Sequence, residues 1–326
     1  MQKIDKKDQR IIHALDMHAR MPMTVLAKAV GLSRQVVEYR LKRLQDRGIV
    51  FGSLGIFDSG VVGLKWFRVL FRLKNITKEN KDLFIAYLKK HPQLFWLGEV
   101  GGNWDLVVNF VCKDAFAFNT IFESLISEKG DYIDRYEILI YIDVYDLSRA
   151  YLFNEVNERE MFYHGMQHNE NLKLDSVDKG IVDLLSRDAS LTNVDLGQKL
   201  SVAANTIKNR IERMQKENFL LGYRLFVNPS LLGYRSHMLF LEVTRLDLEK
   251  EKQLYAYLKN IKQITFLVKH MGRWRLGMEI ETKTLEEFQE IFVDIRGKFG
   301  DLITGFESFP LFKDHVIDYF PIGCLE

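Results

Sequence analysis

The sequence predicts an α+β protein made of two repeats, each a winged helix-turn-helix domain followed by a ferredoxin-like βαββαβ sandwich domain. Three observations lead to this prediction. The chain of 326 residues resembles itself at a constant offset of 170 residues. Each copy opens with three short amphipathic helices spaced as in a helix-turn-helix. Each copy then continues with strand and helix patterns in the order β-α-β-β-α-β.

The internal repeat is ungapped and runs from the first helix to the last strand of each copy. Leu15 pairs with Leu185, for example, and Ala86-Tyr-Leu-Lys89 pairs with Ala256-Tyr-Leu-Lys259. So many agreements at one offset indicate two structural units of the same design. We therefore expect helix-turn-helix domains at 1–60 and 174–230, ferredoxin-like domains at 61–147 and 231–320, and a linker at 148–173.

The linker is polar, contains no proline and has a partly helical pattern, which predicts a tether or a short helix. His164 and His168 have the i, i+4 spacing of two metal ligands on one helical face. Neither a cysteine nor a third nearby histidine completes such a site. A solvated linker helix is therefore the preferred interpretation, and we expect no metal ion.

The first helix-turn-helix is marked by residues that start and stop helices. Asp5 is a candidate N-cap, and Thr24 can cap a second helix that ends at Gly31. Ser33 can cap a third helix that ends before Gly48. The β-rich stretch at 49–57 contains two glycines and predicts a short hairpin, the wing of a winged helix.

The following segment has the pattern of a ferredoxin-like sandwich. Gly101-Gly102-Asn103 is a strong hairpin turn between its second and third strands. The expected elements are strands at 66–73, 94–100, 104–112 and 133–145 and helices at 78–90 and 115–127.

The outward face of the third helix has side chains suited to DNA. Val37, Leu41 and Leu44 fall together on a helical wheel and must face the core. The opposite face can hydrogen-bond base edges and phosphates, as a helix in the major groove does. An ordinary solvated face is the competing interpretation. The candidate DNA-binding residues are Ser33, Arg34, Gln35, Glu38, Tyr39, Lys42 and Arg43 and, in the second repeat, Asn205, Lys208, Asn209 and Arg213.

Charge is distributed unevenly along the chain. The total is nearly balanced, with 46 Lys+Arg against 44 Asp+Glu. Residues 1–52, however, contain 11 Lys+Arg and 5 Asp+Glu, whereas residues 172–222 contain 8 and 7. A local basic patch is what phosphate binding needs, whatever the total. We therefore expect the first repeat to provide most of the DNA affinity, and the second helix-turn-helix to contact DNA weakly or serve only packing.

The composition excludes several other classes of protein. An apolar fraction of 47% is incompatible with wholesale disorder. Two cysteines, Cys112 and Cys324, cannot build a disulfide framework or a cysteine-rich zinc site. The sequence has neither a membrane-length apolar run nor a signal peptide, so we expect a cytoplasmic protein without a membrane partner.

The first repeat contains a combination of motifs that is more specific than any one of them. The motifs are Ile4-Asp5-x-x-Asp8-x-x-Ile11-x-x-x-Leu15, Ala19-Arg20, Leu26-Ala27-x-x-Val30-Gly31-Leu32-Ser33, and Arg40-x-x-Arg43-Leu44-x-x-x-Gly48-Ile49-Val50-x-Gly52. Taken together, they resemble the Lrp/AsnC family of leucine-responsive, or feast/famine, transcriptional regulators. The resemblance covers nearly all of both repeats and implies a sequence-specific regulator of double-stranded DNA. It also implies homo-oligomers formed through the ferredoxin-like domains, so that one chain with two units is a built-in pseudo-dimer. Because no Ser/His/Asp order, Walker loop or GxGxxG motif occurs in the sequence, we expect neither enzymatic activity nor a cofactor.

The resemblance further implies a small-molecule effector, often an amino acid, near the sandwich hairpins. A tight turn with a core tryptophan is the structural alternative for these residues. Arg275 stands where the first repeat has the acidic Asp105, so it would pair with a carboxylate ligand or with Asp105 across the pseudo-dimer. The candidate effector residues are Gly101, Gly102, Trp104, Asp105, Gly272, Trp274 and Arg275.

Two other functions compete with DNA-dependent regulation. The family fold resembles that of the sirohaem decarboxylases, which are tetrapyrrole enzymes formed by two related subunits. None of the eight histidines lies in a His-Cys-Tyr-x-Arg-like segment that such a site would use. A pure assembly or sensor module that has lost DNA binding is the other alternative. The intact Gly31-Leu32-Ser33 turn and the basic first repeat oppose it.

Overall fold

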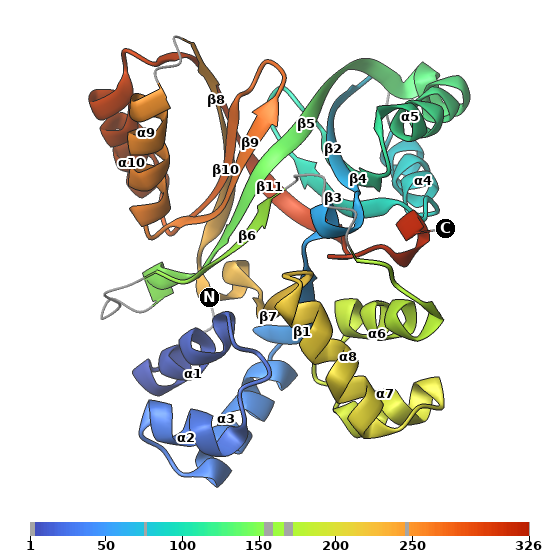
Figure 1. Ribbon diagram of the computed structural model, residues 1–326. Helices are drawn as coiled ribbons and strands as arrows, with labels where there is room; N and C mark the ends of the chain where they lie inside the picture. The colour runs from blue at the N-terminus through green and yellow to red at the C-terminus, as the bar shows by residue number, and fades with distance from the viewer. Residues whose placement is uncertain (1–3, 75–76, 153–158, 166–171, 245–247, 326) are drawn as a thin grey trace.

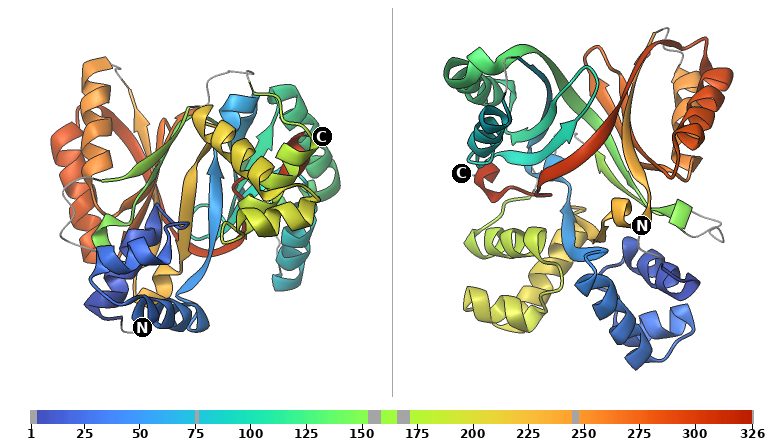
Figure 2. Two further views of the ribbon diagram at one scale, coloured as in Figure 1. Left: turned by 60° about the horizontal axis from the view of Figure 1, so that its bottom comes forward. Right: turned by 180° about the vertical axis from the view of Figure 1, so that it is seen from behind.

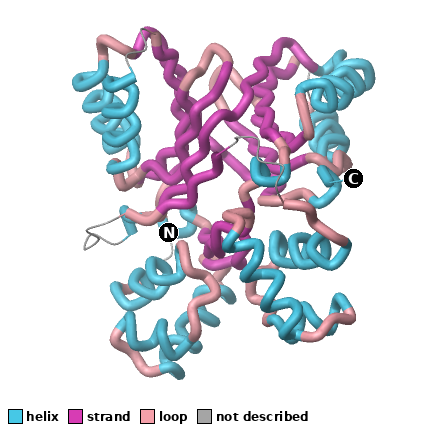
Figure 3. Tube along the Cα trace, in the orientation of Figure 1, coloured by secondary structure: helices cyan, strands magenta, loops and turns pink. Residues whose placement is uncertain are grey.

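The computed structural model describes residues 4–74, 77–152, 159–165, 172–244 and 248–325. It confirms the α+β class and the tandem design. Two helical domains lie side by side beneath a β-barrel, and further helices flank the barrel (Figures 1 and 3). None of the described helices is long and apolar enough to cross a membrane.

Each repeat begins with three helices. Asp5 caps the first helix in a reciprocal capping box with Asp8, and Asp175 does the same with Asp178. The second helix of the first repeat begins at Met23, after Pro22, so Thr24 lies inside the helix instead of capping it. The helices are α1 (Lys6–Asp16), α2 (Met23–Val30) and α3 (Arg34–Asp46), followed in the second repeat by α6 (Ser176–Arg187), α7 (Asn193–Leu200) and α8 (Ala204–Lys216).

The expected wing hairpin is wrong. The stretch after Gly48 is one strand, β1 (Val50–Phe57), and it pairs antiparallel with β7 (Leu220–Val227) of the other repeat. Gly52 sits at a register shift with φ +151 instead of making a turn. The two strands form a separate ribbon between the helical domains, visible beneath the barrel in Figures 1 and 2.

This ribbon exchanges core residues between the repeats. Leu225 and Val227 of β7 are buried in the core of the first helical domain, and Phe57 of β1 is buried in the core of the second. Two matching hydrogen bonds secure the exchange: Ala19 N–H donates to the Tyr223 carbonyl at 2.9 Å, and Ala189 N–H donates to the Ser53 carbonyl at 2.7 Å. Each helical domain therefore completes its core with a strand from the other repeat.

The two sandwich domains follow the predicted βαββαβ order. Their strands are covered on the outer side by the helices (Figures 1 and 2). The first comprises β2 (Lys65–Leu73), α4 (Lys78–Leu88), β3 (Leu94–Val100), β4 (Leu106–Cys112), α5 (Ala115–Lys129) and β5 (Ile133–Leu147). The second comprises β8 (Arg235–Val243), α9 (Leu248–Asn260), β9 (Ile264–Met271), β10 (Leu276–Thr282), α10 (Leu285–Phe299) and β11 (Ile303–Ile317).

The two sheets close into one barrel. The strand order β2-β4-β3-β11-β8-β10-β9-β5 returns to its start because β5 also pairs with β2. The 15-residue strands β5 and β11 make this possible, since each pairs along one half with its own sheet and along the other half with the sheet of the other repeat. The upper interior is filled by a cluster that includes Leu70, Trp104, Trp274 and Phe309.

The linker differs from the expected helix. It contains a short 3-10 turn, Ala150–Leu152, and a strand, β6 (Met161–Gly165), that extends the sheet beside β5. His164 is fully buried in this strand, with its ring 5.3 Å from that of Trp66, while His168 lies outside the described residues. A helical pair of metal ligands is therefore excluded. No cluster of three or more metal-binding side chains occurs in the described part of the chain.

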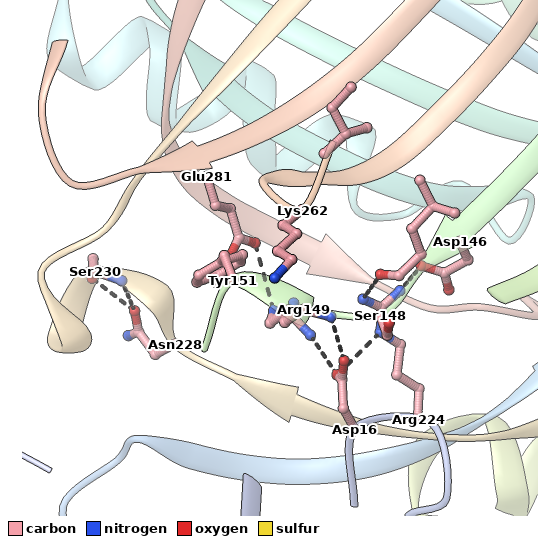
Figure 4. Close-up of polar contacts among 12 residues, drawn as sticks. Asp16, Asp146, Ser148, Arg149, Tyr151, Arg224, Asn228, Ser230, Lys262 and Glu281 are labelled. Carbon is pink, nitrogen blue, oxygen red and sulfur yellow. Dashed lines mark hydrogen bonds and ion pairs between the residues drawn. The ribbon is translucent and has the colours of Figure 1, made fainter. Parts of the chain in front are cut away.

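A buried network of charged residues joins the first helical domain to the barrel (Figure 4). Asp16, at the end of α1, accepts hydrogen bonds from the backbone N–H of Arg149 at 2.6 Å and from its Nη1 at 3.1 Å. Arg149 also lies 3.6 Å from Glu281 of β10, and Arg224 of the ribbon forms an ion pair with Asp146 of β5. The carboxylate of Asp16 in α1 thus helps to hold the Arg149 guanidinium close to Glu281 of the barrel.

We predict that Asp16→Ala lowers the free energy of unfolding by about 3–5 kcal/mol, because it leaves the buried Arg149 and Arg224 short of negative charge. Asp46→Ala is the matched control, since its exposed pair with Lys42 contributes little. Urea denaturation monitored by circular dichroism measures both variants. Equal stability of the two variants would contradict a structural role for the network.

Candidate nucleic-acid interface

The third helix of the first repeat presents a polar surface to the solvent. Ser33 caps it by accepting a hydrogen bond from Val36 N–H at 3.4 Å, and Gly31 takes the left-handed conformation with φ 66 that ends α2. Tyr39 projects with 67% of its surface exposed. The predicted residues that lie exposed along this helix are Ser33, Arg34, Gln35, Glu38, Tyr39 and Lys42.

Cations on this surface are paired only with exposed neighbours along the helix. Arg34 Nε lies 2.7 Å from Glu38, and Lys42 Nζ lies 3.0 Å from Asp46. Exposed pairs with i, i+4 spacing contribute only about 0.3–0.5 kcal/mol. A phosphate can therefore replace either carboxylate at little cost, which makes these two cations available to a nucleic acid.

Arg43 makes a structural contact that its helical-wheel position does not suggest. Its Nη2 donates to Asp8 at 2.7 Å, and Arg40 Nη1 donates to both Asp5 and Asp8. Asp8 is only 1% exposed. The pair of arginines therefore holds α3 against the start of α1. The Arg43 side chain is still 37% exposed, so this positioning role adds to its predicted contact with DNA.

The second repeat reproduces this support but not the surface. Arg210 and Arg213 bind Asp178 in the same way, at 2.8 and 2.5 Å, so Arg213 is also a positioning residue. Asn205, Lys208 and Asn209 are exposed.

Three differences weaken the second surface. Arg34 and Lys42 correspond to Ala204 and Glu212 at the 170-residue offset. Lys208 lies 3.7 Å from Glu212. The helix also lacks a side-chain cap, because Ala203 stands in place of Ser33.

Contacts between the helical domains fix their spacing. Arg20 Nη2 donates to the Leu191 carbonyl at 3.0 Å, and its Nη1 donates to the Tyr223 hydroxyl at 3.1 Å, while the guanidinium lies over the Tyr223 ring. Together with the ribbon, these contacts hold both helix-turn-helix units on the same side of the barrel (Figure 1).

The predicted effector residues separate into two groups. Asp105 accepts a hydrogen bond from Leu73 N–H at 2.8 Å, and Arg275 lies 3.3 Å from Glu251 of α9. The expected pairing of Arg275 with Asp105 is therefore wrong, because each side chain is engaged within its own repeat. Gly102 takes φ 80 in its turn, and Gly272 takes φ 140.

Trp104 and Trp274, in contrast, line one shared pocket of about 450 Å³. All of its lining residues except Arg135 form pairs related by the 170-residue offset, so the pocket lies where the two repeats meet. Sequence reasoning missed its two glutamates, although the coincidence of Glu137 and Glu307 at the repeat offset was a usable signal. The lining residues are Asn103, Trp104, Arg135, Tyr136, Glu137, Arg273, Trp274, Phe306 and Glu307.

Hydrogen bonding in this pocket is asymmetric. Trp274 Nε1 donates to Glu137 at 3.0 Å, but the equivalent bond from Trp104 to Glu307 is not made. Trp104 Nε1, Glu137 Oε1 and Glu307 Oε1 are buried atoms without a hydrogen-bond partner among the described residues. Burial also raises the pKa of Glu137. Unsatisfied buried polar atoms are costly, so this pocket is a candidate ligand site.

Comparison with known proteins assigns the helical domains. The AsnC-type helix-turn-helix domain family matches residues 4–45 and 174–215. The regulatory protein AsnC of Escherichia coli is 22% identical over 125 residues, covering 38% of this chain and 82% of that protein. The proline dehydrogenase transcriptional activator of Rhodobacter capsulatus is 26% identical over 121 residues, covering 36% of this chain and 77% of that protein.

A solved structure matches the complete tandem architecture. The sirohaem decarboxylase NirDL superimposes with a TM-score of 0.61, covering 98% of this chain and 96% of that one. Sequence identity is only 14%, so this likeness concerns the fold.

We predict that Arg43→Ala lowers the free energy of unfolding by about 1–2 kcal/mol, because the buried Asp8 loses a charged hydrogen-bond donor. Arg34→Ala should change the free energy of unfolding by less than about 0.5 kcal/mol, since the pair of Arg34 with Glu38 is exposed. Urea denaturation of both variants makes the comparison. Equal effects would argue against a positioning role for Arg43.

Proposed function

Because this chain is a tandem protein of the Lrp/AsnC type, with an AsnC-type helix-turn-helix in each half, we propose that it is a sequence-specific DNA-binding transcriptional regulator. The exposed surface of α3 is the observation that carries this proposal. It combines a capped recognition helix, two cations held only by exposed pairs, and side chains that can read base edges.

The two halves contribute unequally to the proposed DNA contact. The helix α3 would enter a major groove, with nearby cations on the phosphates. The helix α8 lacks the counterparts of Arg34 and Lys42 and would add Asn205, Asn209 and Lys208. One chain would therefore bind an asymmetric site with a strong and a weak half. A palindromic site would require two chains.

We predict that Arg34→Ala weakens binding to a selected operator by about 1–3 kcal/mol if the residue reads a base. Lys42→Ala should reduce the slope of log affinity against log salt concentration by about one, because one phosphate contact is lost. Genomic selection followed by footprinting supplies the operator, and fluorescence anisotropy at several salt concentrations gives the affinities.

Lys252→Ala, an exposed cation on α9, is the control and should bind like the natural protein. Asn209→Ala should have a smaller effect than Tyr39→Ala. Failure to enrich any DNA sequence would refute the proposed function.

The pocket between the repeats supports an effector site for a free α-amino acid. Glu137 and Glu307 would accept from the ammonium group, while Arg135 and the Trp104 N–H would donate to the carboxylate. Four aromatic rings, from Trp104, Tyr136, Trp274 and Phe306, surround the space for the side chain. Ligand occupancy would satisfy the polar atoms that lack partners.

We predict that calorimetric titration with the common amino acids and keto acids identifies a ligand, and that Glu307→Gln weakens it about 10-fold through loss of a charged hydrogen bond. Glu286→Gln, on the exposed start of α10, is the control. If no compound gives a binding heat in the titration, the effector proposal is refuted and the DNA-binding proposal is unaffected.

Assembly beyond one chain would use the outer surfaces of the sandwich domains. The barrel closes within one chain, so the strands of its ring already pair with each other. Leu83 of α4 and Phe116 of α5 are 62% and 81% exposed, and they offer apolar contact area for a second copy. We therefore place the homo-oligomer contact on these helices.

The tetrapyrrole alternative has less support. Its favourable observation is a large cavity at the base of the barrel, together with the complete fold match to NirDL. The described lining of that cavity, however, contains four Lys/Arg against three Asp/Glu. Such a balance suits a polycarboxylate poorly. Anaerobic incubation with sirohaem and an absorbance scan separates the two functions.

A further inference from the structure

The base of the barrel is hollow. The apolar cluster around Trp104 and Trp274 fills the upper interior, whereas a cavity of about 1120 Å³ occupies the end that faces the helical domains. Its walls include residues of β2, β3, β4, β8, β9, β10 and β11, and also Gly48 and the ribbon residues Phe51 and Phe226. A volume of this size accommodates a ligand the size of a drug molecule or larger.

A buried arginine lines this cavity without an ion-pair partner among the residues that the structure describes. Arg68 of β2 is only 3% exposed, and its Nε donates to Asn109 Oδ1 at 3.0 Å. Its guanidinium lies 5.0 Å from the ring centre of Tyr141 and 5.7 Å from that of Phe240. Across the described residues, no carboxylate lies within 4.0 Å of Arg68.

This arrangement is unusual for a buried cation. Arg149 and Arg224, which are also buried, each have carboxylate partners. Burial lowers the pKa of Arg68, and Glu279 is a more distant acidic neighbour. Burial and the nearby Glu281 raise the pKa of Glu279, which makes this carboxyl a weak counter-charge for Arg68. An uncompensated charge in the interior is costly unless an anion pairs with it.

The fold itself does not require this arginine. At the 170-residue offset, Arg68 corresponds to Met238, which also lines the cavity on the equivalent strand. Asn109 similarly corresponds to Glu279. The repeat thus shows that an apolar side chain packs well at this position. The positive charge of Arg68 is therefore better explained by a role in binding an anion than by a contribution to the stability of the fold.

The rest of the wall is largely aromatic. Phe95, Trp96, Phe309 and Tyr319 face the same cavity as Arg68. We propose that this cavity binds a small organic carboxylate with an apolar body, its carboxylate held by Arg68 and Asn109 and its body packed among these rings. This site is separate from the pocket between Trp104 and Trp274, and its binding activity goes beyond the proposed function.

The cavity also reaches the chain that follows the recognition helix. Gly48 and Phe51 come directly after α3, and Phe51 packs edge-on against Phe226 across the ribbon, with ring centres 5.7 Å apart. A ligand touching these residues acts on the connection between α3 and the barrel. The consequence for DNA affinity rests on the proposed function, whereas ligand binding itself does not.

The test is calorimetric titration of the full chain, without DNA, with 1-naphthylacetate and with decanoate. The neutral amide of 1-naphthylacetate is the matched control ligand, because it keeps the apolar body and loses the charge. At least one carboxylate should bind, and 1-naphthylacetamide should bind at least about 10-fold more weakly than 1-naphthylacetate. This comparison uses only the natural protein, so it does not depend on the folding of a variant.

Arg68→Met copies the residue of the other repeat and should weaken carboxylate binding at least about 10-fold while keeping or raising the melting temperature. Lys65→Met, on the same strand but outside the cavity wall, should leave binding unchanged. A lower melting temperature with unchanged binding would make Arg68 a structural residue and overturn the proposal.

Two further outcomes would also overturn the assignment. Equal affinities for 1-naphthylacetate and 1-naphthylacetamide would show that the ligand carboxylate does not pair with Arg68. Binding of uroporphyrin alone, with neither monocarboxylate, would assign the cavity to polycarboxylate tetrapyrroles instead. If a carboxylate binds but DNA affinity does not change, the site stands and only its coupling to α3 fails.

Discussion

The pairing of β1 with β7 is the constraint on which the rest of the molecule depends. Because the two strands come from different repeats, each helical domain contains a strand of the other repeat in its core. The recognition helices cannot change their spacing without breaking this ribbon or the Arg20 contacts beside it. The closed barrel repeats the same exchange through β5 and β11.

Local sequence patterns predicted most of the elements but none of the exchange. Capping residues, glycines and apolar periodicity are local, so they located the helices and the βαββαβ order. The strand at 50–57 looked like a hairpin because its partner lies in the other repeat, far from it in the sequence. Strand pairing over such a distance leaves no local signal.

The candidate site was predictable to a similar extent. The position of Arg43 on the helical wheel indicated an outward direction, but its long side chain reaches back to the buried Asp8. Trp104 and Trp274 were found through their turns, whereas Glu137 and Glu307 lie on strands whose meeting depends on the closed barrel. Arg68 lay within an apolar strand and carried no motif.

The exchanged ribbon also sets the order in which the domains can fold during synthesis. The first helical domain contains Leu225, Val227 and Leu232 in its core. A ribosome must therefore synthesise the chain at least as far as Leu232, in the second repeat, before the first domain can close. Until then, the apolar faces of α1 and α2 stay open to other nascent chains, and pairing between two copies would give an exchanged dimer with the same contacts. Because both repeats lie in one polypeptide, the correct partner strand is kept at a high effective concentration.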